Sequence, residues 1–381
     1  MKRVLLVSFH DPLCTNYGAG QRTNLLARGL ARAASLDVVL FDASIKDFNT
    51  TRLPPDLGAG FIYRIPYKSR SPLGNTKTLL RSPALTSSLK DHIDITQYDS
   101  VVCRYITPAT KIDLSGAKHL VIDFDDPIYR QNPGQRAPLL HTIVNPINKF
   151  ITDRYVNKRH NRQHHYLFVS QQDADHFDLP NSSILPNIPL IDNSINMETH
   201  STEAAVILFV GFLGWQPNAE GITHFVRHVW PLIHQQHPHA ILRIVGKCPD
   251  LLRQQLNDAS GCHVMGFVSD LRAEYEKATF CVVPLLSGGG SNIKLPEAYA
   301  YKRAVVASRY SYTAWSDLLV EDEDIMVADS PADMAARCLH LLRNERELQR
   351  ITRNGSEKIA THLSFDAFAS RLDDVLNRRS A

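Results

Sequence analysis

Short apolar runs alternate with segments of helical periodicity along most of this chain. Runs rich in Val, Ile and Leu that are separated by helices are typical of strand–helix–strand units with parallel, buried strands. One helix is predicted at Gln21–Ala34. The predicted strands of the first half are Val4–Phe9, Leu36–Phe41, Ser100–Cys103, Leu120–Phe124 and Tyr166–Val169. The pattern predicts an α/β fold with a parallel sheet.

A polar segment at Pro189–Thr202 interrupts the alternation, which then begins again. The predicted strands of the second half are Val206–Val210, Ala240–Val245, Val264–Val268, Phe280–Pro284, Ala304–Ala307 and Ile325–Val327. The predicted helices are Asn218–His234, Pro249–Leu256, Leu271–Lys277, Lys294–Ala300 and Pro331–Arg343. A domain usually has ~100–200 residues. We therefore predict two doubly wound, Rossmann-like domains, at 1–188 and 204–363, joined by a linker at 189–203 and facing each other across a cleft.

Composition limits the classes of function. The net charge of +3 is too small to indicate a nucleic-acid-binding surface, which needs a concentrated basic stripe. The six cysteines form no CxxC pair and no cluster with metal-ligand spacing, as is usual for a reduced, intracellular protein. The first apolar run is too short for a signal peptide, and no run reaches the ~18 residues of a membrane span. We expect a cytoplasmic protein, with contact to a membrane surface left open.

The segment Gly288–Ala298 carries the most chemical information. It follows a predicted strand and opens a predicted helix, where ligands of open α/β sheets bind. Its glycines let the backbone approach a ligand closely, and the free N–H groups of the helix start suit a phosphate. Lys294 adds a positive charge, and Glu297, on the same helix face, can accept hydrogen bonds from vicinal hydroxyls. A nucleotide diphosphate meets these demands; a glycine-rich turn capping an ordinary helix is the structural alternative.

This segment resembles the donor-binding signature of glycosyltransferase family 4, whose members have the GT-B fold. The resemblance extends over most of the second half and is looser in the first. The matching segments are Phe209–Gly211, Trp215–Asn218, Ile244–Gly246, Gly266–Leu271, Gly18–Gly20, Val169–Ser170 and Leu185–Asn187.

The resemblance implies a role for individual residues. Glu297 is expected to hold the donor ribose, and Lys294 the diphosphate. The other expected donor-binding residues are Gly211, Gly288, Gly289, Gly290, Ser291 and Asn292, with Phe267 and Val268 at the base and Gly18, Ala19 and Gly20 facing the donor. It also implies a metal-independent reaction with retention of anomeric configuration, no cofactor, and a terminal helix within 364–381 that packs on the N-terminal domain.

Two departures from the family pattern concern charge. Gly289 stands where many relatives have a glutamate, and Phe212–Gly214 stands where relatives often have an arginine and a lysine. The negative charge of the phosphates must then be balanced by Lys294 and helix dipoles. Three further residues are candidates to contribute positive charge: Arg22, Lys247 and Arg309.

The N-terminal domain is expected to bind the acceptor through side chains that follow its strands. The candidates are His10, Arg104, Tyr105, Asp125 and Asp126. Asp125 or Asp126 could orient an acceptor hydroxyl. His10 and Asp125 are candidate catalytic residues together with Lys294 and Glu297. Solvated turns are the alternative for each of these segments. We do not interpret Asp123, Asp125 and Asp126 as a metal site, because they lie outside the half expected to hold the diphosphate.

A basic, amphipathic segment spans Lys149–His165. A core-packed helix with a solvated basic face is the simpler interpretation, and contact with anionic lipid head groups is the alternative.

The sequence therefore predicts a glycosyltransferase that moves a sugar from a nucleotide-diphosphate sugar to a hydroxyl of a glycan, glycolipid or small molecule. Two alternatives remain: a sugar-nucleotide epimerase on the same fold, and a non-catalytic family member that binds nucleotide or acts as a scaffold.

Overall fold

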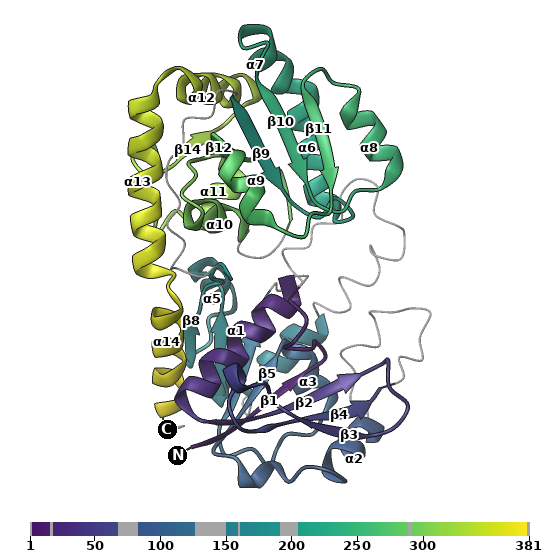
Figure 1. Ribbon diagram of the computed structural model, residues 1–381. Coiled ribbons are helices and arrows are strands. Elements are labelled where there is room, and N and C mark those ends of the chain that lie inside the picture. Colours follow the sequence, from purple (N-terminus) through teal and green to yellow (C-terminus); the bar gives the residue numbers. More distant parts are fainter. Residues whose placement is uncertain are drawn as a thin grey trace. The chain divides into compact units, whose positions relative to one another are not determined.

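The computed structural model describes residues 2–15, 18–67, 83–125, 150–158, 161–190, 205–288 and 292–378. It divides into a first unit, Met1–Leu190 with Phe365–Ala381, and a second unit, Ile191–Ser364 (Figure 1). Each unit is an α/β layer structure with its own sheet, as the alternating sequence pattern predicts.

The sheet of the first unit has eight strands in the order β3-β4-β2-β1-β5-β6-β7-β8. They are β1 (Arg3–Ser8), β2 (Ser35–Asp42), β3 (Asn49–Arg52), β4 (Phe61–Pro66), β5 (Ser100–Arg104), β6 (Leu120–Phe124), β7 (His165–Phe168) and β8 (Ser182–Ile184). Among the strands that the structure describes in this unit, β3 alone is antiparallel to its neighbour. The five predicted strands are confirmed to within a residue or two, whereas β3, β4 and β8 were not predicted.

Helices of the first unit are α1 (Gly18–Ala33), α2 (Pro83–Lys90), α3 (Ile106–Lys111), α5 (Gln171–Phe177) and α14 (Phe365–Asn377). The terminal helix α14 packs on α1. A glycine allows this close approach, because a Cβ at Gly29 would lie 2.6 Å from the Leu372 side chain. The apolar face of α14, with Phe368 and Leu372 buried, therefore belongs to this unit's core.

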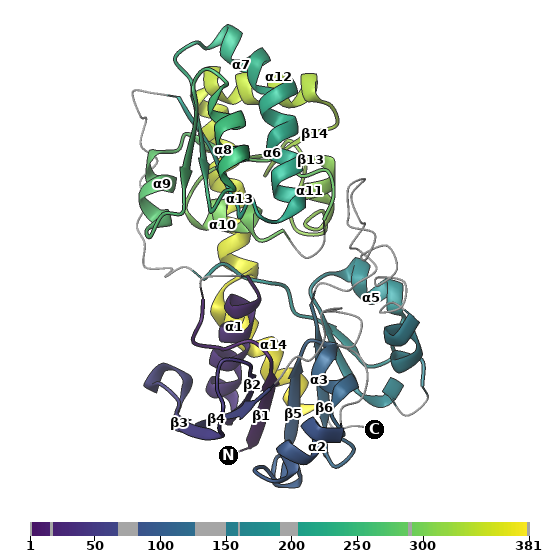
Figure 2. The same ribbon diagram turned by 90° about the vertical axis from the view of Figure 1, so that its right-hand side faces the viewer.

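The second unit has six parallel strands in the order β11-β10-β9-β12-β13-β14. They are β9 (Val206–Val210), β10 (Ile241–Val245), β11 (Cys262–Gly266), β12 (Phe280–Val283), β13 (Val305–Ser308) and β14 (Met326–Ala328). The helices are α6 (Gln216–His228), α7 (Trp230–Gln236), α8 (Asp250–Asn257), α9 (Leu271–Lys277), α10 (Lys294–Ala300), α11 (Arg309–Thr313), α12 (Pro331–Arg343) and α13 (Glu345–His362). Figures 1 and 2 show α8 and α13 on opposite sides of this unit.

Two local expectations for the second unit were wrong. The single helix predicted at Asn218–His234 is two helices, α6 and α7, which meet at Val229. Pro231 causes the break, since a proline has no N–H to continue the helical ladder. The strand predicted at Val264–Val268 lies two residues earlier, at Cys262–Gly266, because Gly266 adopts a positive φ of 76° that ends the extended backbone.

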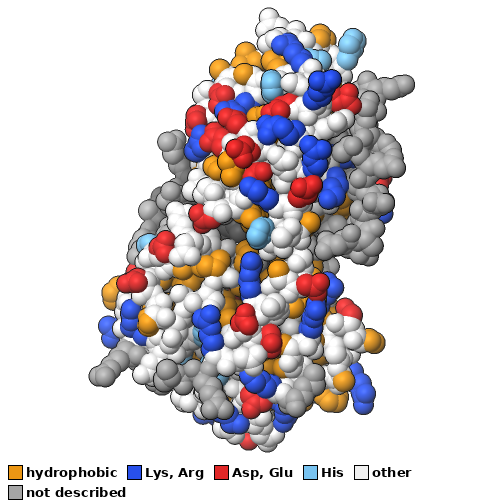
Figure 3. Space-filling model, turned by 90° about the vertical axis from the view of Figure 1, so that its left-hand side faces the viewer, with side chains coloured by type: hydrophobic (Ala, Val, Ile, Leu, Met, Phe, Trp, Pro, Cys, Tyr) orange, Lys and Arg blue, Asp and Glu red, His pale blue; other side chains and the backbone are white. Residues whose placement is uncertain are grey.

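Charged side chains of both signs are interspersed on the described part of the face shown in Figure 3. Ion pairs within α12 and α13, such as Arg337–Asp333 and Arg350–Glu347, are examples from the second unit. No helix in the described ranges is both long enough and apolar enough to cross a membrane.

Candidate functional site

The second unit places its glycine-rich segment at a topological switch point. Strand order reverses between β9 and β12, since β10 and β11 lie on one side and β13 and β14 on the other. Two loops therefore leave the carboxyl edge of the sheet side by side: Gly211–Trp215 after β9 and the loop from Pro284 to Ile293 after β12. Ligands of open α/β sheets bind at this position.

Lys294 is the first residue of α10 and lies against the loop that follows β9. Its ammonium nitrogen is 5.5 Å from the centre of the Trp215 ring. A Cβ at Gly211 would lie 3.0 Å from Lys294 Cε and 2.9 Å from Asn218 Nδ2, so only glycine leaves room for this arrangement. Burial lowers the pKa of Lys294 to about 8, and the Glu297 charge opposes this shift. Among the described residues Lys294 has no ion-pair partner within bonding distance.

Glu297 lies one turn further along α10 and is half-buried. The Tyr275 hydroxyl donates a hydrogen bond to Glu297 Oε2 over 2.9 Å. Burial raises the pKa of Glu297, while this hydrogen bond and the Lys294 charge lower it. The sequence predicted Lys294 and Glu297 on one helix face, and the structure places both beside the switch point. The sequence did not predict a role for Tyr275, whose only local signal is an aromatic residue between Glu274 and Glu276 in helix α9.

Close packing holds α10 in place. Pro296 lies in the first turn, where its missing N–H removes no helical hydrogen bond. The buried Tyr299 ring fits against α13 because Gly355 has no side chain; a Cβ there would lie 2.3 Å from Tyr299 Cε1. The Ser356 hydroxyl donates to the Tyr299 carbonyl, at 2.8 Å. The helix that carries Lys294 is thus fixed from its buried side.

The described ends of the glycine-rich loop have the backbone that such a loop requires. Gly288 has φ of +136°, and a Cβ at this position would lie 2.8 Å from the Trp215 ring. The Tyr310 hydroxyl donates to the Gly288 carbonyl over 2.6 Å. Asn292 has φ of +49°, and its buried side-chain oxygen and nitrogen have no hydrogen-bond partner among the described residues. Gly289, Gly290 and Ser291 lie outside the described residues.

The remaining donor-side predictions fall on separate elements. Phe267 and Val268 lie in the loop between β11 and α9, two strands away from β9, with Phe267 73% exposed. Gly18, Ala19 and Gly20 form the first turn of α1 and not a loop. The Thr23 hydroxyl, one turn further along α1, donates to the Ala19 carbonyl over 2.8 Å.

Two of the three additional phosphate-binding candidates are engaged elsewhere. Arg22 is 1% exposed and pairs with Asp123, at 2.6 Å. Arg309 pairs with Glu321 and with Asp329, at 2.6 and 2.8 Å. Lys247, in the loop after β10, is exposed.

The first unit has a buried charge network at the carboxyl ends of β5 and β6. Arg104 is fully buried, and its guanidinium binds Asp123 at 3.0 Å and Asp125 at 2.9 Å. Asp123 also accepts hydrogen bonds from Arg22. The alternative of a solvated turn is therefore wrong for Arg104, because two arginines and two aspartates balance each other's charge inside the protein. Asp126 lies outside the described residues.

His10 and Tyr105 border this network. Their rings lie 5.3 Å apart, and the Arg104 guanidinium lies 3.6 Å from the centre of the Tyr105 ring. Tyr105 has φ of +68°, an uncommon backbone for a bulky residue and one that is found at functional sites. Burial, and to a smaller degree the Arg104 charge, lowers the pKa of His10 to about 4, so His10 is neutral near pH 7. The structure thus brings together four of the acceptor-side candidates: His10, Arg104, Tyr105 and Asp125.

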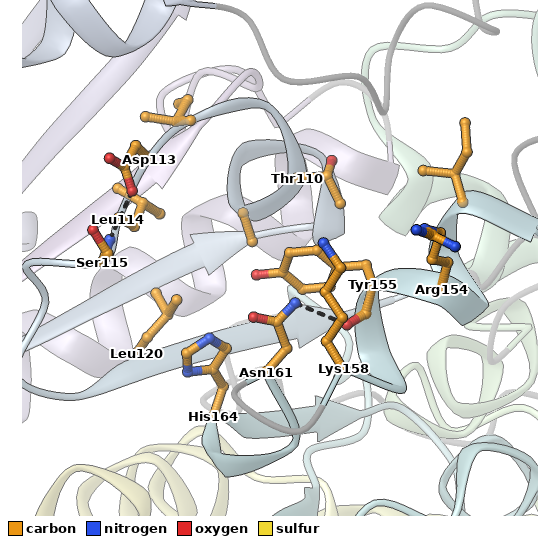
Figure 4. Close-up of a pocket in the computed structure, with 13 residues that line it drawn as sticks. Thr110, Asp113, Leu114, Ser115, Leu120, Arg154, Tyr155, Lys158, Asn161 and His164 are labelled. Atoms are coloured by element: carbon orange, nitrogen blue, oxygen red, sulfur yellow. Dashed lines mark hydrogen bonds between the residues drawn. The ribbon is translucent and has the colours of Figure 1, made fainter.

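A separate cavity of about 530 Å³ lies in the first unit, away from these strand ends (Figure 4). Its lining includes Thr110, Leu120 and Tyr155. It adjoins the described part of the basic segment, where Thr152 and Val156 are buried while Arg154 and Lys158 are exposed. The helical residues 150–156 therefore pack on the core on one side and have a solvated basic side, as the simpler interpretation expected.

Within the described ranges, no group of three His, Cys, Asp or Glu side chains is placed to hold a metal ion. A metal-independent reaction stays a prediction.

Comparisons with known proteins concern the family and the fold. Residues 204–344 match the model of the family described as glycosyl transferases group 1. A search of curated proteins finds no match. The structure is similar to sucrose-phosphate synthase from Thermosynechococcus elongatus, with 16% identity over 98% of each chain and a TM-score of 0.71. It is also similar to WaaG, a glycosyltransferase involved in lipopolysaccharide biosynthesis, with 15% identity over 98% of this chain and 99% of the other, and a TM-score of 0.67. Anabaena HepE in complex with UDP and glucose matches at 12% identity, 99% of each chain and a TM-score of 0.67.

The fold is thus GT-B, the two-sheet architecture of one large class of glycosyltransferases. The protein is a glycosyltransferase whose second unit contains the group 1 domain. The finer assignment to glycosyltransferase family 4 stays a prediction.

Proposed function

We propose that the protein transfers a sugar from a nucleotide-diphosphate sugar to a hydroxyl acceptor and binds the diphosphate at the switch point of its second unit. One observation carries the proposal: Lys294 is a half-buried ammonium group without an ion-pair partner among the described residues. A cation that is removed from water in this way needs a counter-charge. A diphosphate at the glycine-rich loop would supply that charge.

The groups around Lys294 suit the rest of such a donor. Glu297 can accept hydrogen bonds from the ribose hydroxyls. The side-chain amide of Asn292, which has no partner in the described part of the chain, can donate to a phosphate or sugar oxygen. Two structures of the same fold support a nucleotide-sugar donor by their titles: HepE contains UDP and glucose, and an Escherichia coli trehalose-6-phosphate structure contains UDP-2-fluoro glucose.

The chemistry follows from the charge that develops at the donor. The bond between the anomeric carbon and the diphosphate oxygen breaks, and negative charge grows on the leaving diphosphate. Lys294 stabilises this charge before and during bond cleavage, which is electrostatic preorganisation. The acceptor oxygen attacks from the same face that the diphosphate leaves, and the acceptor's proton passes to a diphosphate oxygen. This route needs no enzyme nucleophile and retains the anomeric configuration.

The site assignment is tested with Lys294→Ala and Glu297→Ala. Each should lower transfer sharply with donor in excess, whereas Lys277→Ala should not. Lys277 is the matched control, because it is an exposed lysine of the same unit that pairs with Glu274. Normal transfer by both site variants would contradict the assignment.

The type of reaction is tested with a thermal-shift screen of UDP, GDP, ADP and their sugars, followed by product analysis with and without acceptor. A bound nucleotide raises the melting temperature because it binds the folded state. Conversion of the donor sugar without acceptor would favour an epimerase. Binding without turnover would favour a non-catalytic protein.

The acceptor is assigned to the first unit, at the carboxyl ends of β1, β5 and β6. His10 and Asp125 lie there with the strained Tyr105, and Asp125 has a side chain that is 10% exposed. His10→Gln is the informative variant, because it leaves the buried charges intact. It should raise the KM for acceptor more than the KM for donor; equal effects on both would count against the assignment.

We also propose a cytoplasmic location with peripheral contact to anionic membranes. Phe150 is 64% exposed; the exposed Arg154 lies one helix turn further on, and the exposed Lys158 lies just after the helix end. Aromatic and basic side chains on one face suit a lipid surface. Vesicles that contain phosphatidylglycerol should co-float the protein at low salt, and an Arg154→Glu/Lys158→Glu variant should float less. Absence of the wild-type protein from the floating fraction at low salt would refute this contact.

A further inference from the structure

Tyr275 is held rigidly next to α10, in a position that no motif of the sequence predicted. Its side chain is 1% exposed. The Tyr275 ring stacks on Tyr301, with centres 4.3 Å apart and planes at 13°. Arg303 Nε donates to the Tyr275 carbonyl, at 2.6 Å, which fixes the backbone of the same residue. The Tyr275 hydroxyl is therefore set in place before any ligand binds.

This hydroxyl has one partner, the Glu297 carboxylate, at 2.9 Å from Oε2. Burial, followed by the Glu297 charge, raises the pKa of Tyr275 well above its usual value. The phenol thus stays protonated and is always the donor. Glu297 Oε1 has no hydrogen bond within the described part of the chain. One carboxylate oxygen is therefore anchored and the other is free.

An ionised carboxylate can accept about four hydrogen bonds, whereas a protonated one must donate at one oxygen. Burial favours the neutral form of Glu297, and the Tyr275 hydrogen bond and the Lys294 charge oppose it. Loss of the Tyr275 hydroxyl would leave the carboxyl group free to rotate and easier to protonate. A rotating carboxylate does not hold its acceptor oxygens in a fixed position, and a protonated one has a donor at one oxygen, so both bind a pair of neighbouring hydroxyls less well.

We infer that Tyr275 is a positioning residue that orients the Glu297 carboxylate to accept two hydrogen bonds from the 2′- and 3′-hydroxyls of the nucleotide, so that the site selects ribonucleotides over their deoxy counterparts. The inference rests on the proposed nucleotide-sugar function and adds the residue that sets its sugar selectivity. A polar contact of this kind discriminates strongly, because a ligand without the hydroxyl leaves a half-buried charge without a partner.

The structure offers a matched pair of variants. Tyr275→Phe removes one hydroxyl and keeps the ring that stacks on Tyr301. Tyr301→Phe removes a hydroxyl from the other ring of the same stack, where it forms no hydrogen bond to a described residue. A purely structural role of the stack would make the two variants alike. Glu297→Gln is the reference for complete loss of the acceptor charge.

The experiment measures dissociation constants of UDP and 2′,3′-dideoxy-UDP by calorimetry, with GDP or ADP and their dideoxy analogues if the thermal-shift screen selects another base. The wild-type protein should prefer the ribonucleotide by about 10- to 100-fold, the range for hydrogen bonds to a charged group. Tyr275→Phe should lower this preference about tenfold by weakening ribonucleotide binding alone. Tyr301→Phe should keep the wild-type preference.

The pH dependence gives a second measurement. Since the Tyr275 hydrogen bond lowers the pKa of Glu297, its loss should move the acid-side decline in ribonucleotide binding to higher pH. An unchanged ribose preference in Tyr275→Phe, or equal weakening of ribo and dideoxy ligands, would overturn the inference while the proposed function stands. If none of the three diphosphates binds the wild-type protein, the proposed function fails and the inference fails with it.

Discussion

The lowered pKa of Lys294 makes a quantitative prediction for nucleotide binding. At a pKa of about 8, roughly nine-tenths of Lys294 is charged at pH 7 and roughly one-tenth at pH 9. If the charged form carries the diphosphate interaction, affinity should fall about tenfold between these two values. A lysine with the ordinary pKa of 10.5 would stay charged over the whole interval and predict no change. The terminal phosphate is not responsible, because its second pKa is near 6.

Trp215 provides the assay. Its ring lies beside the Lys294 ammonium and is 36% exposed, whereas Trp230 and Trp315 are buried. Nucleotide titrations followed by tryptophan fluorescence, at constant ionic strength from pH 7 to 9.5, should give a dissociation constant that rises with pH.

Two variants isolate the cause. Lys294→Arg should bind with a flat pH profile, because an arginine stays charged throughout. Lys294→Gln should bind weakly and also without pH dependence. A wild-type affinity that is constant up to pH 9.5, or a tenfold decline that persists in Lys294→Arg, would refute the reasoning.

Three further predictions concern stability. Gly355→Ala should lower the free energy of unfolding by about 1–3 kcal/mol, because the new Cβ meets the buried Tyr299 ring. This loss is expected although alanine has a better helix propensity than glycine. Urea unfolding followed by tryptophan fluorescence measures it, since all three tryptophans lie in the second unit. Asp123→Asn should lower the free energy of unfolding by about 3–5 kcal/mol, because it leaves an excess of buried positive charge at Arg104. Amide hydrogen exchange in the first unit should then be faster than in the wild-type protein. Acid should destabilise the same unit through His165. Burial lowers the pKa of His165 in the folded protein to about 4, whereas its ordinary pKa in the unfolded chain is 6.5. Protons therefore bind the unfolded chain more strongly, and the stability of the fold falls as the pH drops below 6.5. The loss from this group is about 2 kcal/mol by pH 5, and a His165→Gln variant with an unchanged acid transition would contradict it.

The local sequence was sufficient to predict the bounds of strands and helices that have a clear hydrophobic period or a clear capping residue. The strands Leu120–Phe124 and Val206–Val210 and the helices Leu271–Lys277 and Lys294–Ala300 match the predictions at both ends. In each case the signal lies within the element: a buried apolar run for the strands, and a helical face with start residues for the helices.

Elements that depend on a partner were not predicted. The strand Asn49–Arg52 is exposed at every residue and has no apolar alternation. It exists because it pairs antiparallel with Phe61–Pro66, so its signal lies in the neighbouring strand. Helix α13 (Glu345–His362) was also missed, although its glycine, Gly355, is what lets it pack on α10.

The candidate site also has a part that the local sequence predicts and a part that only the fold brings together. Its glycines, Lys294 and Glu297 lie within eleven consecutive residues, so the chain's own spacing was enough to nominate a phosphate- and sugar-binding segment. Tyr275 lies 22 residues from Glu297, and Arg22 lies 101 residues from Asp123. Periodicity and capping act over a few residues, because they follow from backbone geometry. The partners of a buried charge depend on strand order and on which loops meet at a switch point, and only the folded chain decides these.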